Sequence, residues 1–303
     1  MSIDPETGLA PTVTAGTAGR LSPSARRRRR MVRRFTSRKT AVVGAALSLF
    51  FVLVAVFAPL IAPYSASESD FAMLLYSPSP AHPFGTDELG RDILSRVIIG
   101  ARASIVAGAM ATMLAMVIAV PIGLVAGYYR GVVDMVIMRV NDALLAFPFL
   151  VLAVGLAAIL GPSLVNAALS IGLSAVPPLV RITRGEVMAL REEDYVDGAI
   201  ANGANDFVIL RSHILPNIVN TLLVQATVLI PAAIIAESLL SFLGLGVQPP
   251  APSWGVMLSA AQPYLGQAPW MAIYPGVAIF VATLSFNLLG DGLRDVLDPK
   301  ALT

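Results

Sequence analysis

Residue types that could do covalent or metal chemistry are scarce in this chain. It has no cysteine and two histidines, His82 and His213, and the apolar segments between them place the two on opposite sides of a membrane. A thiolate site and a two-histidine metal site within one chain are therefore both excluded. A phosphate-binding loop needs Gly-Lys followed by Ser or Thr, but the only lysines, Lys39 and Lys300, follow Arg and Pro. The sequence predicts a chain that is not an enzyme and holds no metal or cofactor of its own.

Charged residues inside apolar segments are the remaining candidates for a functional polar site. Glu237 lies in an apolar run with no neighbouring charge in sequence, and such a carboxylate in a membrane is a functional candidate by default. It falls near the end of its segment, so a hydrogen-bonded structural role is an equal alternative. Arg139 and Asp142 lie three residues apart and could pair on one helix, with Asp134 a little earlier. We interpret that pair as structural rather than as a proton relay.

The composition indicates that membrane helices position these residues. Hydrophobic residues make up 56% and charged residues 13% of the 303 positions, whereas soluble domains carry roughly 25% charged residues. A helix needs ~20 apolar residues to cross the hydrocarbon core. Six segments meet or approach that length: residues 41–62, 104–128, 132–160, 163–182, 218–245 and 271–290. The sequence therefore predicts an all-α polytopic membrane protein with six transmembrane helices. The charged first half of the third segment is expected at the cytoplasmic interface or against protein.

Basic residues set the expected orientation. Residues 1–39 begin with small and polar residues and then become basic, with a run from Arg26 to Arg30. Such a tail lacks the apolar mass to fold and is expected to be disordered. Its arginines beside the first span anchor the N-terminus in the cytoplasm, which explains them better than a nucleic-acid patch would. With six spans, both termini are expected on the cytoplasmic side of the cell membrane. The first span begins too far along the chain for a cleavable signal peptide.

Two patterns lie at the entry to the second span. Thr86 is a plausible N-cap with Asp87 and Glu88 in the first turn, and the apolar residues that follow predict an interfacial helix on the outer membrane surface. Small residues at four-residue spacing then favour close helix contact, either within the bundle or in a dimer. These are Gly100, Ser104, Gly108 and Thr112.

Residues 191–217, here called the knob segment, form the longest polar stretch between the apolar segments of the second half. Glu193 or Asp194 can cap a first helix that runs through Ala201, because a side-chain oxygen can accept the free amides of the first turn. Gly203 can end that helix, since glycine takes the left-handed conformation without steric cost.

A second helix is expected directly after this joint. Asn205 can cap it, and Asp206 in its first turn is favourably placed against the helix dipole. Pro216 either ends the segment or opens the next helix. The knob segment therefore predicts two short helices with a defined joint, a compact docking knob at the membrane surface.

The knob segment resembles the cytoplasmic coupling loop of ABC importer permeases, whose pattern runs Glu-Ala-Ala, three residues, Gly, nine residues, Ile, one residue, Leu-Pro. Asp197, Gly198 and Ala199 occupy the first three positions here, and Leu215-Pro216 the close. Asp replaces Glu, Gly198 replaces the first Ala, and His213 stands at the Ile position; these departures could alter the strength of ATPase docking. The residues that the resemblance assigns to ATPase coupling are Asp197, Ala199, Gly203, Ala204, Asn205, Asp206, Leu215 and Pro216.

Three further stretches resemble the C-type permeases of the dipeptide, oligopeptide and nickel importers. They are residues 82–96, 236–246 and 286–299. The resemblance covers most of residues 40–300 and implies the type I ABC importer permease fold. Residues 40–99 would hold the first transmembrane helix and an extracytoplasmic loop. Residues 100–303 would hold five more, with the coupling loop 184–216 between the fourth and fifth spans.

The resemblance implies a transmembrane permease subunit of an ATP-driven importer, which forms a path for di- or oligopeptides with a second, homologous permease. Two cytoplasmic ATPase subunits would bind ATP and Mg²⁺, and an extracytoplasmic peptide-binding protein would deliver substrate; no nucleic acid is implied. A nickel importer of the same family is the nearest alternative. An ion-coupled secondary transporter that uses Glu237 is the alternative from another class. A membrane scaffold that recruits partners through its arginine tail would leave the knob segment unexplained.

Overall fold

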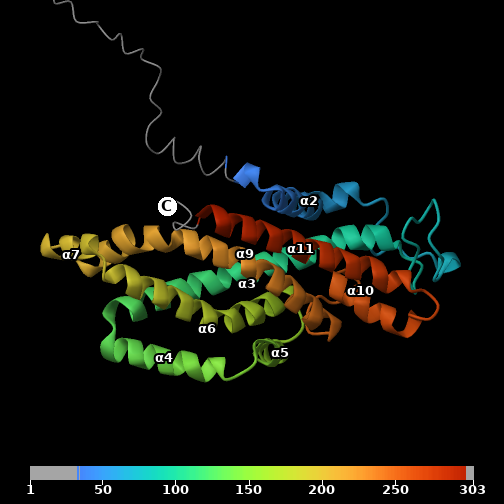
Figure 1. The fold of residues 1–303 in the computed structure, drawn as a ribbon. Coiled ribbons are helices and arrows are strands. Elements are labelled where there is room, and N and C mark those ends of the chain that lie inside the picture. The colour runs from blue at the N-terminus through green and yellow to red at the C-terminus, as the bar shows by residue number, and fades with distance from the viewer. Residues whose placement is uncertain (1–32, 34, 298–303) are drawn as a thin grey trace, which may run out of the picture.

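The computed structural model describes residues 33 and 35–297, which form an elongated bundle of helices (Figure 1). Residues 1–32 and 34, most of the predicted disordered tail, lie outside this described part. The α-helices are α2 (Lys39–Ile61), α3 (Ile93–Tyr129), α4 (Gly131–Leu145), α5 (Phe149–Leu160), α6 (Leu164–Arg191), α7 (Asp194–Ala201), α8 (Asp206–Val208), α9 (Leu215–Phe242), α10 (Trp254–Ala261) and α11 (Trp270–Leu297). Short helical turns are η1 (Phe71–Met73), η2 (Ile209–Ile214) and η3 (Gln262–Tyr264).

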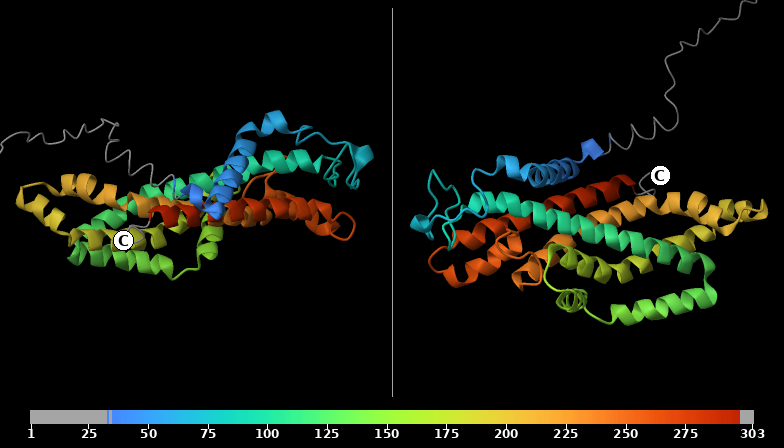
Figure 2. Two further views of the ribbon diagram at one scale, coloured as in Figure 1. Left: turned by 45° about the horizontal axis from the view of Figure 1, so that its top comes forward. Right: turned by 180° about the vertical axis from the view of Figure 1, so that it is seen from behind.

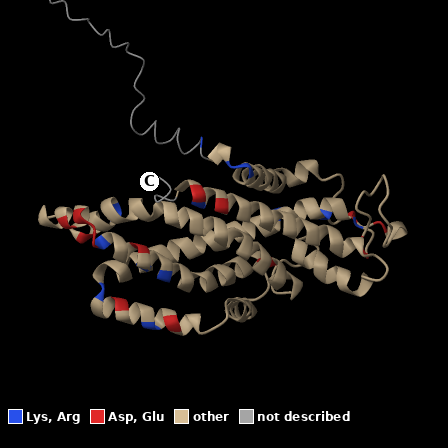
Figure 3. Ribbon diagram, viewed as in Figure 1, with Lys and Arg blue, Asp and Glu red and all other residues tan. Residues whose placement is uncertain are grey.

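The bundle has two distinct ends. α7 projects at one end, here called the knob end, whereas α10 and residues 62–92 lie at the other, here called the loop end (Figures 1 and 2). Charged residues gather around α7, along α4 and in the loop that precedes α3, and the ribbon between them is mostly uncharged (Figure 3). This distribution is that of a helical bundle whose middle lies in hydrocarbon and whose ends reach polar surroundings.

Five helices of the described chain are long and apolar enough to cross a membrane. They are Lys39–Ile61, Ile93–Tyr129, Leu164–Arg191, Asp206–Phe242 and Trp270–Leu297. A sixth span exists only if α4 and α5, which are bent by 87° relative to one another, count as one. The predicted all-helical polytopic class is therefore confirmed, with five of the six spans as single helices.

The prediction of one continuous third span over residues 132–160 was wrong. α4 ends at Leu145, and Pro148 then has an extended backbone, with φ −54° and ψ 135°, before α5 begins at Phe149. Proline has no N–H for a helical hydrogen bond and disfavours helix at the residue before it. The two halves consequently take different directions, and α5 is seen almost end-on in Figure 1 while α4 runs along the bundle.

The acidic residues of α4 pair with α6 rather than with each other. Asp142 accepts a hydrogen bond from Arg181 at 2.7 Å, and both carboxylate oxygens of Asp134 accept from Arg184. The expected pair between Arg139 and Asp142 was therefore wrong, although the structural interpretation of Asp142 holds. A guanidinium on a neighbouring helix can meet a carboxylate with two parallel N–H groups, and that geometry fastens α4 to α6.

Small residues allow α3 to approach both α6 and α9 closely. A Cβ at Gly123 would lie 2.5 Å from Cβ of Thr183 on α6, and one at Gly108 would lie 2.9 Å from Cγ1 of Ile234 on α9. Neither position has room for a larger side chain. Gly108, a member of the predicted small-residue stripe, thus serves packing within the chain.

The interfacial helix expected from Thr86 is absent, because α3 begins at Ile93 and continues directly into the second span. The Thr86 hydroxyl accepts a hydrogen bond from the Tyr76 amide at 2.8 Å instead of capping a helix. Asp87 accepts from the amides of Leu89 and Arg91, which closes a tight turn. Helix initiation falls to Asp92, whose side chain accepts from the Ser95 amide at 2.8 Å, the arrangement of a side-chain N-cap.

Candidate functional site

The joint of the knob segment forms as its sequence predicts. α7 ends at Ala201, and Gly203 has φ +80°, the left-handed region that favours glycine. The Ala204 amide donates back to the Ala199 carbonyl at 3.1 Å, which satisfies one of the free carbonyls of the α7 terminus. Asn205 then accepts from the Val208 amide at 2.9 Å, so the expected N-cap of the next helix is present.

Two details of the knob segment differ from the prediction. Glu193 occupies the N-cap position of α7, but its side chain makes no capping hydrogen bond. The second helix is not a separate short element, because α8, the π-helical turn η2 and α9 continue into one another as a single 37-residue helix. Pro216 lies directly after the π-helical turn, in the first turn of α9, so it opens α9 rather than ending the segment. The knob is therefore α7 packed beside the end of a long helix.

The underside of the knob is buried and its tip is exposed. Val196 of α7 packs with Ile209, Ile214 and Ile218 of the long helix in one buried cluster. By contrast, Phe207 at the tip is 68% exposed, and the apolar side chains of Ile200 and Val208 are exposed as well. The knob thus has a buried apolar base and an exposed tip on which apolar side chains lie among acidic ones.

Polar contacts tie the knob to the ends of α3 and α6. The Tyr128 hydroxyl donates to Asp206 at 2.9 Å, and the Arg191 guanidinium lies 5.4 Å from the centre of the Tyr128 ring. Arg130 donates to Glu192 at 2.9 Å and to the Met188 carbonyl. Sequence reasoning missed these residues because each contact joins positions far apart in the chain. Asn205 as the N-cap and Asp206 in the first turn were identifiable from the sequence; the partner of Asp206 on α3, Tyr128, was not.

The π-helical turn η2 joins the knob to α9. Within it the His213 carbonyl accepts a hydrogen bond from the Asn217 side chain at 2.6 Å, whereas Nδ1 of His213 is buried without a partner. Asn217 also donates to the Tyr195 hydroxyl of α7 at 3.3 Å. Burial and the neighbouring Glu193 carboxylate raise the pKa of Tyr195. Leu215 and Pro216 follow η2 directly and are the first two residues of α9.

Glu237 lies far from the knob, near the opposite end of α9. Its side chain is fully buried. One carboxyl oxygen accepts from Ser104 of α3 at 2.7 Å and the other from Ser241 at 2.7 Å. Both oxygens thus have hydroxyl donors, as a hydrogen-bonded structural role requires.

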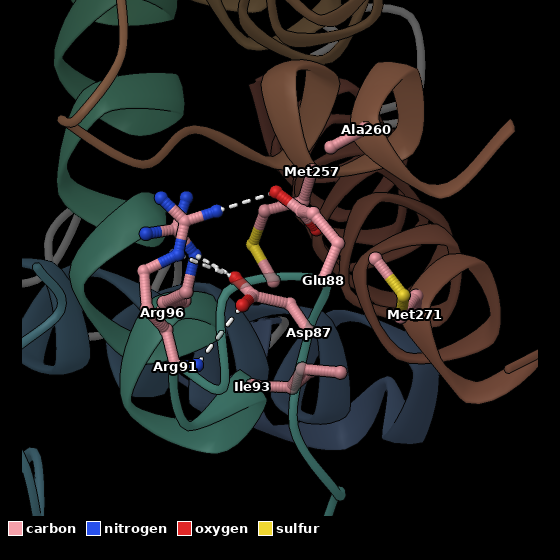
Figure 4. A pocket seen from close by; sticks show the side chains of 8 residues that line it. All are labelled: Asp87, Glu88, Arg91, Ile93, Arg96, Met257, Ala260 and Met271. Carbon is pink, nitrogen blue, oxygen red and sulfur yellow. Dashed lines mark hydrogen bonds and ion pairs between the residues drawn. The ribbon is translucent and has the colours of Figure 1, made fainter. Parts of the chain in front are cut away.

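A second polar cluster fixes the loop end to α3 (Figure 4). Arg91 pairs with Asp87 at 2.6 Å and with Glu88 at 2.7 Å. Arg96 lies 3.4 Å from Asp87 and donates to the Ala66 carbonyl at 2.6 Å. Burial, followed by the Asp87 charge, raises the pKa of Glu88. Every arginine here has an acidic partner, so the cluster anchors the loop before α3 rather than presenting free charge.

These features define a class: a polytopic helical membrane protein with a knob at one end that has a buried base and an exposed tip. The sequence places it within that class, since residues 119–303 match the family described as "Binding-protein-dependent transport system inner membrane component". Residues 27–78 also match the "N-terminal TM domain of oligopeptide transport permease C". The chain belongs to this family of ABC importer permeases, whose members are transport components rather than catalysts.

Curated relatives agree with that assignment. The chain is 44% identical over 262 residues to the dipeptide transport system permease protein DppC of Alkalihalophilus pseudofirmus, over 86% of each chain. It is 43% identical over 269 residues to the glutathione transport system permease protein GsiD of Pectobacterium atrosepticum, over 88% of this chain and 89% of the relative. The GsiD protein of Escherichia coli O157:H7 is 44% identical over the same extent. The resemblance to C-type permeases is confirmed.

Proposed function

We propose that this chain forms the translocation path of an ATP-driven importer for di- or oligopeptides, together with a second, homologous permease. The observation that carries the mechanism is the knob. Its buried base packs with Val187 of α6 and is hydrogen-bonded to Tyr128 of α3, while apolar side chains at its tip stay exposed. A docking element must be rigid in this way if a movement of its partner is to reach the spans. The family supports the transport role, and the dipeptide and glutathione relatives support a small peptide as the cargo.

The partners follow from the same assignment. Two cytoplasmic ATPase subunits would bind ATP and Mg²⁺, and one of them would dock on this knob. An extracytoplasmic binding protein would deliver the peptide at the loop end of the bundle, and the arginine-rich N-terminal tail supports a cytoplasmic N-terminus in the cell membrane.

The contacts with the ATPase are assigned to named residues. The α7 terminus and the start of the long helix would supply them through Asp197, Ala199, Gly203, Ala204, Asn205 and Asp206. Leu215 and Pro216 would set the entry into α9.

The two alternatives have less support. A nickel importer fits the architecture, but the curated relatives described above are named for dipeptide and glutathione. A secondary transporter would need an ionisable residue free to exchange an ion, whereas both Glu237 oxygens accept hydrogen bonds from serines.

The test is ATP hydrolysis by the complex purified through a tag on this chain and reconstituted in lipid. Hydrolysis that rises with peptide and binding protein, with ATPase subunits and a second permease in the preparation, supports the proposal. Stimulation by nickel alone would keep the architecture and replace the cargo. A chain that purifies alone under mild extraction, with uptake that collapses when the ion gradient is removed, would overturn it.

A further inference from the structure

Glu237 connects three parts of the loop end. Ser104, which donates to it, lies on α3, while Ser241 lies in the last turn of α9. The Ser241 hydroxyl in turn accepts from the Val247 amide at 3.2 Å. One buried carboxyl group therefore bonds α3 to α9 and, through Ser241, to the loop after α9.

α10 closes the same junction. Trp254 is fully buried and its indole N–H donates to the Val97 carbonyl of α3 at 3.0 Å. A Cβ at Gly255 would lie 2.1 Å from the Ser238 carbonyl oxygen, so α10 meets α9 backbone to backbone. α3, α9 and α10 consequently pack as one unit around Glu237, with little room for any of them to shift alone.

The same two long helices are bonded again at the knob end. There Tyr128, near the end of α3, donates to Asp206 at the start of the long helix. At ~1.5 Å per residue, Asp206 and Glu237 lie roughly 45 Å apart along that helix. α3 and the long helix are thus joined by hydrogen bonds at two separate places, one toward the knob end and one toward the loop end.

We propose that Glu237 is a positioning residue for transport, which makes the loop end follow movements that begin at the knob. A push on the knob moves the start of the long helix. The helix transmits the push along its length, and the bonds of Glu237 pass it to α3, to the loop after α9 and to α10. Without these bonds the long helix would move while the loop end lagged behind. This inference rests on the proposed function, because it takes the knob as the ATPase-docking element.

The transport test uses the full complex in liposomes and compares three variants. Ser104→Ala removes only the α3 bond, Glu237→Leu removes both bonds, and Glu237→Gln keeps an oxygen acceptor and adds an N–H donor. Ser170→Ala is the matched control, because Ser170 is equally buried but bonds only to Asn166 within its own helix. We expect Ser104→Ala to lower peptide transported per ATP by about tenfold, the size of one buried hydrogen bond to a carboxylate. Glu237→Leu, which removes both bonds, should lower it further. Basal ATP hydrolysis should stay unchanged, and Glu237→Gln should retain most of the coupling.

A distance measurement separates positioning from simple stability. The chain has no cysteine, so spin labels at cysteines introduced in place of the exposed Arg102 and Leu243 report on α3 and α9 alone. In the otherwise unchanged chain the distribution of the distance between the two labels should stay narrow in the resting and ATP-trapped states. In Ser104→Ala the distribution of this distance should broaden, although the variant still folds and assembles with its partners.

Unchanged transport per ATP together with a narrow distance in Ser104→Ala would overturn the inference. If Glu237→Leu does not fold, Ser104→Ala and Glu237→Gln still decide it. The label distance in the resting state needs no partner ATPase. Failure of the proposed function would appear instead as an unaltered chain without ATPase subunits or peptide stimulation.

Discussion

Replacing Gly203 with alanine should weaken the coupling of ATP hydrolysis to transport. Gly203 has φ +80°, and a Cβ added there would meet no atom within 4 Å. A substitution at this position therefore causes no steric clash with a neighbour and acts only through the backbone. The joint between α7 and α8 is the element under test, because its conformation sets where the tip residues stand relative to the spans.

The free-energy cost of the substitution follows from the backbone conformation of Gly203. A non-glycine residue in the left-handed region costs about 1–2 kcal/mol. The joint can relieve that strain by adopting another conformation, which would displace α7. An energy of this size shifts the equilibrium between the two conformations of the joint by roughly 5- to 30-fold. Gly203→Val should cost more than Gly203→Ala, since a β-branched side chain is least tolerated at positive φ. Gly203→Asn should cost little, because asparagine accepts this conformation.

The assay is peptide-stimulated ATP hydrolysis and uptake by reconstituted complexes, with membrane levels measured in parallel. The expected order of coupling is wild type and Asn first, then Ala, then Val, at equal insertion. Gly185→Ala is the matched control: Gly185 lies within α6, outside the proposed docking residues, has no atom within 4 Å of an added Cβ, and has no positive φ. Equal losses in the Asn and Ala variants, or a loss in Gly185→Ala as large as in Gly203→Ala, would refute the reasoning.

Three further perturbations have expected outcomes. Tyr128→Phe removes the hydrogen bond to Asp206 and should raise the apparent Kd for the ATPase subunits by about tenfold, since hydrogen bonds to charged groups contribute ~1.5–3 kcal/mol. Gly123→Ala places a Cβ 2.5 Å from that of Thr183 and should lower the free energy of unfolding by ~1–3 kcal/mol, as overpacking does, measured by thermal unfolding in detergent. Glu88→Gln should raise the Tm at neutral pH and lose that advantage as the pH falls. The folded state raises the pKa of Glu88, so ionisation of this carboxyl opposes folding above its unfolded pKa and has no effect below it.

Each of these has a control and a contrary result. Tyr76→Phe, on an exposed side chain of the loop end, should leave ATPase binding unchanged, and an equal effect of the two tyrosine variants would argue against the knob contact. Gly155→Ala, where an added Cβ meets nothing within 4 Å, should not destabilise the chain; a loss equal to that of Gly123→Ala would remove the packing argument. A Tm difference between Glu88→Gln and the unaltered chain that is independent of pH would show that ionisation of Glu88 is not its cause.

The sequence predicts the features that depend on local chemistry. Apolar length identifies five of the spans as single helices, and the turn chemistry of Gly203 and Asn205 places the joint and its cap correctly. It does not predict contacts between distant positions, so the bond of Tyr128 to Asp206 and the pairing of Asp134 with Arg184 had to come from the structure. α10 was missed because its eight residues have the composition of a loop helix too short for periodicity to identify. Thr86 was predicted as an N-cap from its residue type, but its hydroxyl accepts a hydrogen bond from the Tyr76 amide and holds the loop before α3 instead.

The divided third span has a physical reason. A straight helix over residues 132–160 would carry Asp134, Arg139 and Asp142 on the way through hydrocarbon, where each unpaired charge costs about 2.5–3.5 kcal/mol even on the lowest scale. The break at Pro148 separates the charged helix α4 from the apolar helix α5. α4 keeps its carboxylates beside the arginines of α6, toward the knob end, and α5 has only apolar and small residues. Replacing Pro148 with alanine should therefore not yield one straight span, because the ion pairs with α6 still hold α4 in place. Removing both Arg181 and Arg184 as well should release α4, because these two arginines make the ion pairs with Asp142 and Asp134.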